Sequence, residues 1–355
     1  MTWTAKAPLW ILATTAIMGG LYWFADALTQ FALALILWLT IDGFARYVGE
    51  KLPFLPKAVT VPFALILVVG IGACCAWVVA DNVGALTTHA GDYEARLNEL
   101  LAQVHARLAA TGPAPTVGEL LSQANPTDLV SAIGDALQGL ASDALFIFIY
   151  LGFLFAAAST FPGKLDAIFK DPGARAQAAK VFTSIRTSME RYLWVQTIAS
   201  LIITGLTYIT LEMIGLDNAL LWAFIIFFLN YIPTIGSLVA VALPTVFALV
   251  QFDQLGSVAA VAAGVGVWQF VIGNFIQPRM TGESLNLSTL VVLLALAIWG
   301  TIWGIAGAFL AAPLTVMLMI VLAQFPSVRW IAVLLSADGK PEVFNTPDKE
   351  DPKVA

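Results

Sequence analysis

The chain has 355 residues, of which 59% are hydrophobic and 11% are charged, and its formal net charge is −6. Charged residues make up about 25% of an ordinary soluble domain, so this composition, with a mean hydropathy of +0.86, excludes a soluble globular protein. No basic patch with interleaved aromatic residues occurs, which excludes nucleic acid as a partner. Several apolar runs have the roughly 17–25 residues that a membrane span needs. We therefore expect an all-α polytopic membrane protein.

Residues 1–80 are expected to form the first three spans. The first two, over about 8–25 and 27–41, meet at a tight turn at Asp26. Residues 42–57 contain Arg46, and Pro53 and Pro56 end any helix there, so we expect a polar loop. The third span covers the rest of this unit.

Residues 81–143 are polar and acidic, and we expect an extracytoplasmic pair of amphipathic helices, the second of which begins after 125–127. This second helix runs on into the fourth span. In the unit 144–194, a basic stretch follows that span, and Pro172 is placed to begin an interfacial helix that leads into the fifth.

Lysine and arginine residues concentrate in three places, namely 42–57, 161–194 and the tail 326–355. Basic loops stay in the cytoplasm. We therefore expect both termini to be cytoplasmic and the acidic segment to lie outside.

The unit 195–325 contains a broken apolar run, which extends from 219 to 250 and is interrupted by Asn-Tyr-Ile-Pro-Thr-Ile-Gly at 230–236. Pro233 lacks a backbone donor and Gly236 adds conformational freedom, so we do not expect a helix to cross this segment. In hydrocarbon, a broken backbone survives only where it is buried in protein or lines a wet cavity. Transporters place substrate sites at such discontinuous helices.

A second long apolar stretch, 287–323, shows a weak echo of the first. Its Thr301–Gly304 resembles Thr234–Gly236, and its Pro313 corresponds to Pro244, although chance similarity in an apolar background is the alternative explanation. Either stretch as one straight helix would exceed a bilayer of about 30 Å. We therefore expect each to make two passes or to form a re-entrant hairpin.

Polar side chains near the first break are the candidate substrate ligands, because they lie beside freed backbone carbonyl groups. Buried amides also join helices, so both roles remain open. The candidates are Asn230, Tyr231, Thr234, Gln269, Asn274 and Gln277. The candidate helix-break or hinge positions are Pro233, Gly236, Gly300, Gly304 and Pro313, although the glycines of the second stretch also fit close helix packing.

Charged candidates are few. Arg279 could bind an anion or lock a gate against Glu283, and ordinary positive-inside placement is the alternative. Glu212 and Asp217 lie at expected outer ends of spans, where they are either proton or cation ligands or simply solvated acids. The middle of the predicted spans contains no clear charged residue, which weakens a proton-relay mechanism.

Signals for enzymatic chemistry are missing from the sequence. The two histidines, His89 and His105, lie in the acidic segment without metal-ligand spacing, and no Walker-type glycine loop occurs. We therefore expect no catalytic residue, no metal and no cofactor.

The motifs of the unit 195–325 occur together in one known family. They are Asn230–Gly236, then Gln277-Pro278-Arg279 followed by Gly282, Leu285 and Leu287, then Trp299-Gly300 with Trp303-Gly304 and Gly307, then Ala312-Pro313-Leu314. In combination they resemble the autoinducer-2 exporter family of bacterial membrane transporters.

The resemblance implies a secondary transporter or facilitator in the bacterial inner membrane, which it would cross about eight times. It would export a small polar metabolite or signal such as autoinducer-2, with or without coupling to a monovalent cation or proton. It would act as a homo-oligomer, for which the resemblance implies a pentamer. A sodium(lithium)/proton antiporter and a non-transporting membrane scaffold or regulator are the alternatives. Thr234 stands where relatives often have Asn, so that position leaves the substrate open.

Overall fold

A computed structural model describes residues 15–51, 126–281 and 286–341, together with isolated positions at 12 and between 62 and 105. Side chains are described in the second range from 143 onward. The predicted third span and most of the acidic segment lie outside the described residues. Within the described part, the regular structure is helical, with a single isolated bridge between Leu287 and Ser336, which confirms the all-α fold.

The helices follow one another with short connections. In chain order they are α2 (Ala25–Lys51), α6 (Pro126–Ile168), α7 (Pro172–Ile214), α8 (Ala219–Leu229), α9 (Ile235–Gln251), α10 (Leu255–Val271), a π-helical turn (Ile272–Ile276), α11 (Gln277–Thr281), α12 (Thr289–Ala323) and α13 (Arg329–Leu335). Among the described residues, five stretches are long and apolar enough to cross a membrane: Ala25–Gly49, Asp143–Ile168, Pro172–Ile214, Leu255–Met280 and Thr289–Ala323. A polytopic membrane protein is therefore confirmed.

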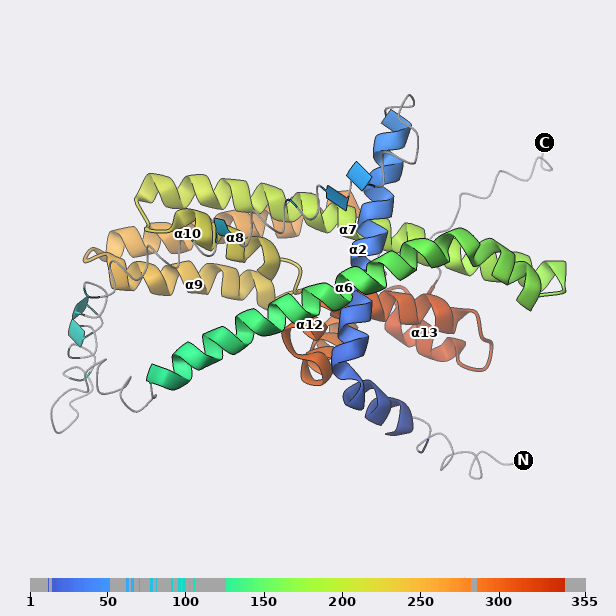
Figure 1. The fold of residues 1–355 in the computed structure, drawn as a ribbon. Coiled ribbons are helices and arrows are strands. Elements are labelled where there is room, and N and C mark those ends of the chain that lie inside the picture. The colour runs from blue at the N-terminus through green and yellow to red at the C-terminus, as the bar shows by residue number, and fades with distance from the viewer. Residues whose placement is uncertain are drawn as a thin grey trace, which may run out of the picture.

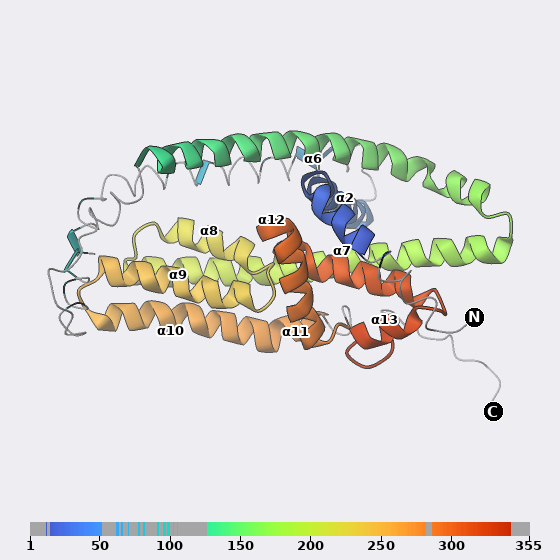
Figure 2. The ribbon, with the colours of Figure 1, turned by 90° about the horizontal axis from the view of Figure 1, so that it is seen from below.

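The helices form two parts that share α7. Figure 2 shows α8, α9 and α10 running alongside one half of α7, while α6 forms an outer arc with α2 crossing between it and the rest. The bent helix α12 stands at the middle of the molecule, beside the ends of α9 and α11 (Figures 1 and 2). The middle of α7 is thus the point where the two parts meet.

The N-terminal helix differs from the prediction in two ways. The amide of Phe24 donates to the carbonyl of Gly20 (3.0 Å) and that of Leu28 donates to Phe24 (2.9 Å), so the chain bends before α2 and does not reverse at Asp26. The expected loop at 42–57 is helical as far as Lys51. Side-chain pairing explains this, because Arg46 lies one turn after Asp42 and forms an ion pair with it (3.3 Å).

The two longest helices agree with the prediction. α6 continues from the expected amphipathic segment into the fourth span without interruption. α7 begins with Pro172 at its first position, and the carboxylate of Asp171 accepts a hydrogen bond from the amide of Ala174 (2.7 Å). It continues for 43 residues to Gly215, whose left-handed conformation (φ 82°) ends it. One helix therefore joins the basic interfacial segment to the transport unit.

The tail 326–355 begins with ordered structure. α13 is followed by a turn in which the carboxylate of Asp338 accepts hydrogen bonds from the amide of Lys340 (2.8 Å) and the side chain of Asn286 (2.8 Å). These bonds, the backbone one first, hold the pKa of Asp338 below its usual value. Residues 342–355 lie outside the description.

Two apolar clusters correspond to the two parts of the molecule. The first packs α2 and the start of α7 against the second half of α12, with Met189, Leu310 and Met319 fully buried. The second packs the end of α7 against α8, α9 and α10, with Leu211 and Val265 fully buried. We call these parts the scaffold part and the hairpin part.

An ion cluster fastens α2 to α7 in the scaffold part. Arg186 contacts Asp42 and lies 3.1 Å from Glu190, while Arg46 contacts both acids. The guanidinium carbon of Arg186 lies 5.7 Å from the centroid of the Trp38 ring. Two positive and two negative charges balance here, and the acids are only about one-fifth exposed, with side-chain exposures of 20% and 17%. The four ionic side chains thus satisfy one another across the helix pair.

Removal of Arg186 should therefore destabilise the α2–α7 pair. We expect Arg186→Ala to lower the free energy of unfolding by about 1–3 kcal/mol, because it leaves Asp42 with fewer partners at a half-buried site. Thermal unfolding of the purified protein measures the effect. Arg175→Ala is the matched control: its pair with Asp166 is exposed, so a change of about 0–1 kcal/mol is expected. Equal effects of the two variants would contradict a stabilising role for the cluster.

Candidate functional site

The first helix break lies at Asn230–Thr234, as predicted. α8 ends at Leu229, and α9 begins at Ile235 after Thr234, whose φ of 65° is unusual for a branched residue. The amide of Gly236 donates to the carbonyl of Ile232 (3.0 Å), which joins the start of α9 to the turn. A Cβ at Gly236 would overlap the carbonyl oxygen of Leu229, so only glycine allows this close approach. At 11 residues, or about 16 Å, α8 is too short to cross the bilayer alone.

The second break lies inside α12, at Trp303 and Gly304. Gly304 has φ 61° and ψ −143°, a conformation that favours glycine, and the chain folds back there. The indole of Trp299 donates to the hydroxyl of Thr315 at 3.3 Å, whereas 16 residues of straight helix would separate them by about 24 Å. A Cβ at Gly307 would overlap the carbonyl oxygen of Trp299. The second apolar stretch is therefore a hairpin too.

The two breaks have the same two features, a residue with positive φ and a glycine in contact with the preceding arm. The residues that correspond are not those that the sequence similarity paired. The residue with positive φ is Thr234 in one and Gly304 in the other, and the glycine that touches the preceding arm is Gly236 in one and Gly307 in the other. The helix continues through Pro313, so the prediction of a break there is wrong. Once Gly304 has reversed the chain, no second interruption is needed.

An amide cluster lies behind the first break. Gln196 of α7 donates from Nε2 to the backbone carbonyl of Asn230 (2.7 Å) and accepts at Oε1 from Nε2 of Gln277 (2.8 Å). Gln269 donates to the side-chain oxygen of Asn230 (2.9 Å). Three of the predicted ligands, Asn230, Gln269 and Gln277, are thus brought together by a fourth amide, Gln196. We call these four residues the amide cluster.

The π-helical turn explains why two amides eight residues apart reach the same cluster. In an α-helix, eight residues turn through about 800°, which would place Gln277 about 80° away from Gln269. The wider i→i+5 turn over Ile272–Ile276 absorbs about one residue, so the remaining rotation is near two full turns. π-turns occur frequently at functional sites. The helix also continues past Pro278 to Thr281, beyond the expected end.

Tyr231 connects the first break to the other helices. Its hydroxyl lies 2.7 Å from the hydroxyl of Thr197 on α7, and its ring stacks on Phe309 in the second arm of α12, with centroids 4.9 Å apart. The next residue, Ile232, packs against both arms of α12 at Leu296 and Ala311. The tip of the first hairpin is therefore in contact with the second hairpin.

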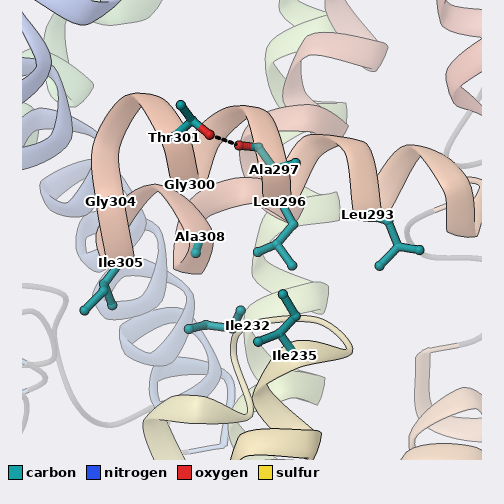
Figure 3. A pocket seen from close by; sticks show the side chains of 10 residues that line it. All are labelled: Ile232, Ile235, Leu293, Leu296, Ala297, Gly300, Thr301, Gly304, Ile305 and Ala308. Carbon is teal, nitrogen blue, oxygen red and sulfur yellow. Dashed lines mark hydrogen bonds between the residues drawn. The ribbon is translucent and has the colours of Figure 1, made fainter.

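A pocket of about 520 Å³ separates the two hairpins at this contact. Figure 3 shows Ile232 and Ile235 of the first hairpin facing the first arm and bend of α12. The α12 residues that line it are Leu293, Leu296, Ala297, Gly300, Thr301, Gly304, Ile305 and Ala308. Among the described residues that line the pocket, Thr301 alone has a polar side chain, and its hydroxyl donates to the carbonyl of Ala297 (2.7 Å). Gly300 and Gly304 thus line the space that the two breaks enclose.

The other candidates lie outside the cluster. Asn274 is exposed and donates to the carbonyl of Phe270 in its own helix (2.9 Å), and Thr234 is exposed at the tip of the hairpin. Arg279 is exposed, and its proposed partner Glu283 lies outside the described residues. Glu212 and Asp217 are also exposed, at the end of α7 and in the following turn.

Sequence reasoning missed Gln196 and Thr197. Both lie on α7, far from the broken segment in sequence, so only the fold shows that they meet Asn230 and Tyr231. One signal was available: Gln196 is an isolated amide within an apolar helix segment, where a polar group needs a partner.

Residues 11–327 match the AI-2E family transporters. The chain belongs to the AI-2E family. One relative, the "AI-2 transport protein TqsA" of Escherichia coli, is 28% identical over 324 residues, which cover 90% of this chain and 92% of TqsA. A "Putative transport protein" of Haemophilus influenzae is 28% identical over 333 residues, or 92% of this chain and 95% of that protein. Another protein of that name, from Borreliella burgdorferi, is 32% identical over 198 residues, or 56% and 54% of the two chains.

Membership in the AI-2E family makes this chain a membrane transporter. The family match over residues 11–327 includes both hairpins, the amide cluster and the helices of the scaffold part except α13. An enzymatic role has no support in the family description.

The close approach at Gly236 should make the first break intolerant of substitution. We expect Gly236→Ala to reduce the yield of folded protein and to lower its unfolding temperature, because the new Cβ would overlap the Leu229 carbonyl oxygen. Size-exclusion chromatography and thermal unfolding measure this. Gly266→Ala in α10 is the control, since no atom lies within 4 Å of its added Cβ. A Gly236→Ala protein as stable as the Gly266→Ala control would show that the contact is not required.

Removal of the Gln196 amide should loosen the same break from α7. Gln196→Met keeps the side-chain length but loses both hydrogen bonds, so we expect the protein to lose about 1–3 kcal/mol of stability. Limited proteolysis and thermal unfolding report the change. Gln254→Met is the matched control, because Gln254 is exposed and its side chain does not cap the helix that it precedes. If both variants unfold at the same temperature, Gln196 does not hold the break.

Proposed function

We propose that this AI-2E transporter exports a small polar metabolite or signal of the autoinducer-2 type across the bacterial inner membrane. The observation that supports this most directly is the meeting of two helix breaks at one pocket, with four amides behind the first break. Transporters bind substrates where helices are discontinuous, because freed backbone groups and polar side chains can then contact the solute. The substrate class is suggested by the printed name of the relative TqsA.

The amides and the pocket would contribute different interactions. The pocket lining is mostly carbon, so it offers contact area and shape rather than hydrogen bonds. Hydrogen bonds to the solute would come from the amide cluster and from carbonyl groups at the break, after the hairpin tip moves. Asn230 is suited to this, because its side-chain nitrogen is buried and has no partner among the described residues.

Alternating access would arise from movement of the first hairpin against the scaffold part. α8 and α9 are tied to α7 and α10 by apolar packing, whereas their tip meets α12 across the pocket. The scaffold part is fastened by the ion cluster and by its own apolar core. A rocking motion of the first hairpin would therefore open or close the pocket without disturbing the scaffold.

The location and assembly of the protein complete the proposal. The placement of lysine and arginine supports cytoplasmic termini, and we propose a homo-oligomer in which each subunit has its own path. The sodium(lithium)/proton antiporter remains an alternative, but Glu212 and Asp217 are exposed, so no described feature favours them as buried ion ligands.

Filling the pocket should stop transport while leaving the fold intact. Ala297 lines the pocket, so we expect Ala297→Phe to reduce uptake of autoinducer-2 into inside-out vesicles by about tenfold or more, which corresponds to about 1.4 kcal/mol. Leu294→Phe is the control, since Leu294 is 57% exposed and does not line the pocket. Purified protein in proteoliposomes gives the same readout without other transporters.

Three outcomes would contradict the proposal. Normal flux through Ala297→Phe would show that the pocket is not on the path. Collapse of a pH gradient on adding sodium or lithium, without autoinducer-2 flux, would favour the antiporter. No flux of any tested solute or cation would favour a scaffold or regulator.

A further inference from the structure

One face of α7 contains buried hydroxyl groups that have no hydrogen-bond partner among the described residues. The side-chain oxygens of Ser200, Thr204 and Thr207 are all of this kind, and Ser200 and Thr207 are completely buried. The side-chain nitrogen of Asn230, at the end of the row, is also buried and unpaired. A buried polar group without a partner destabilises the folded state. Such a group in a native protein therefore indicates bound water or an ion.

Other hydroxyls of the same helix donate hydrogen bonds to backbone carbonyls of α7 itself. Thr197 donates to the carbonyl of Leu193 (2.7 Å), and Thr210 donates to that of Leu206 (2.8 Å). This bond one turn back is the usual solution for a hydroxyl in an apolar helix. Ser200, Thr204 and Thr207 differ from these threonines because, among the described residues, they have no such bond.

The unpaired hydroxyls lie in line with the amide cluster. At 100° per residue, Ser200, Thr204 and Thr207 are rotated by about 40°, 80° and 20° from Gln196, so all four share one face of α7. The row from Gln196 to Thr207 is about 16 Å long, roughly half of a hydrocarbon core of about 30 Å. Buried residues of this face, such as Ile203, pack in the same cluster as residues of α8 and α10.

We propose that this face of α7 binds a row of internal water molecules that runs between α7, α8 and α10 and ends at the amide cluster. Each hydroxyl can donate one hydrogen bond and accept two, and an internal water forms about three. A row of waters would therefore pair the three hydroxyls, one another, and finally the free amide hydrogens of Asn230. This site is distinct from the apolar pocket, which lies on the α12 side of the break.

The water row has a consequence for transport, and this part rests on the proposed function. A polar solute exchanges bonds to water for bonds to protein when it enters the amide cluster. A row of waters at hydrogen-bonding distance from Asn230 would lower the cost of that exchange. Loss of the hydroxyls should then slow flux while the protein still assembles.

Radiolytic hydroxyl-radical labelling of the full chain in nanodiscs tests the water row directly, because radicals formed from bound water react with adjacent side chains. Leu211 lies one turn beyond Thr207 and is fully buried. We expect Leu211 to be labelled on millisecond exposure. Leu310 in α12 is the matched control, since it is also fully buried but lies in the scaffold cluster. Equal, low labelling of the two leucines would overturn the proposal.

The sign of a stability change gives a second test that does not depend on transport. Thr207→Val removes the hydroxyl and keeps the shape. If water is bound there, the variant loses a hydrogen bond and should unfold about 2–4 °C lower. If the interface is dry, the variant removes an unpaired polar group and should unfold at a higher temperature, which would overturn the proposal.

Thr245→Val is the control for this test, because the Thr245 hydroxyl already donates to the carbonyl of Val241 (2.7 Å) in α9. Flux measured on Thr207→Val then separates the two ideas. Lower stability with unchanged flux would retain the water site and remove its role in transport, whereas lower stability with reduced flux supports both.

Discussion

A broken helix in hydrocarbon must find partners for the backbone groups that the break releases, and the rest of this structure depends on how that requirement is met. At the first break, one amide, Gln196 of α7, donates to the carbonyl of Asn230, and the backbone amide of Gly236 donates to the carbonyl of Ile232 in the turn. Without these bonds, the carbonyl groups would face lipid at a cost of several kcal/mol each. The break therefore determines where α7, α10 and α11 must lie.

The same requirement explains the role of α7. This helix carries Arg186 and Glu190 of the ion cluster near its middle and Gln196 of the amide cluster less than two turns further on. One rigid element thus bears the contacts of the scaffold part and those of the hairpin part. A displacement of α7 would change the contacts of both parts. The hairpin tip, in contrast, meets α12 through side-chain packing at Tyr231 and Ile232. The contact between the hairpin tip and α12 is therefore less polar than the contacts that α7 forms with the two parts.

Local sequence signals predicted the breaks but not their partners. The Pro233–Gly236 interruption, the start of α7 at Pro172 and the fold-back of the second apolar stretch all follow from backbone chemistry within a few residues. The loop expected at 42–57 is helical to Lys51 because an ion cluster with α7 outweighs its polar composition. Pairing between residues so far apart in the chain produces no periodic pattern in the sequence from which it could be predicted.

The contacts of the amide cluster also could not be predicted from local sequence. Gln269 and Gln277 were candidates because of their spacing, but the π-turn that aligns them has no clear sequence signature here, and Gln196 belongs to another helix. Pro313 shows the opposite case, in which a strong local signal has little effect. The chain had already reversed at Gly304, and a helix inside a packed bundle tolerates one missing bond.

The two hairpins use glycine for contact as well as for conformation. Gly236 and Gly307 each place a Cα directly against a carbonyl oxygen of the preceding arm, so each arm pair is closed at its tip with no side chain between. A tip closed in this way cannot widen without losing that contact. The two hairpins meet across the pocket, where Ile232 and Ile235 face Gly300 and Gly304. A carbon-lined surface suits movement between the hairpins, because apolar side chains can slide past one another without breaking hydrogen bonds. Gln196 of α7 and Gln269 of α10 meanwhile hold Asn230 from behind the break.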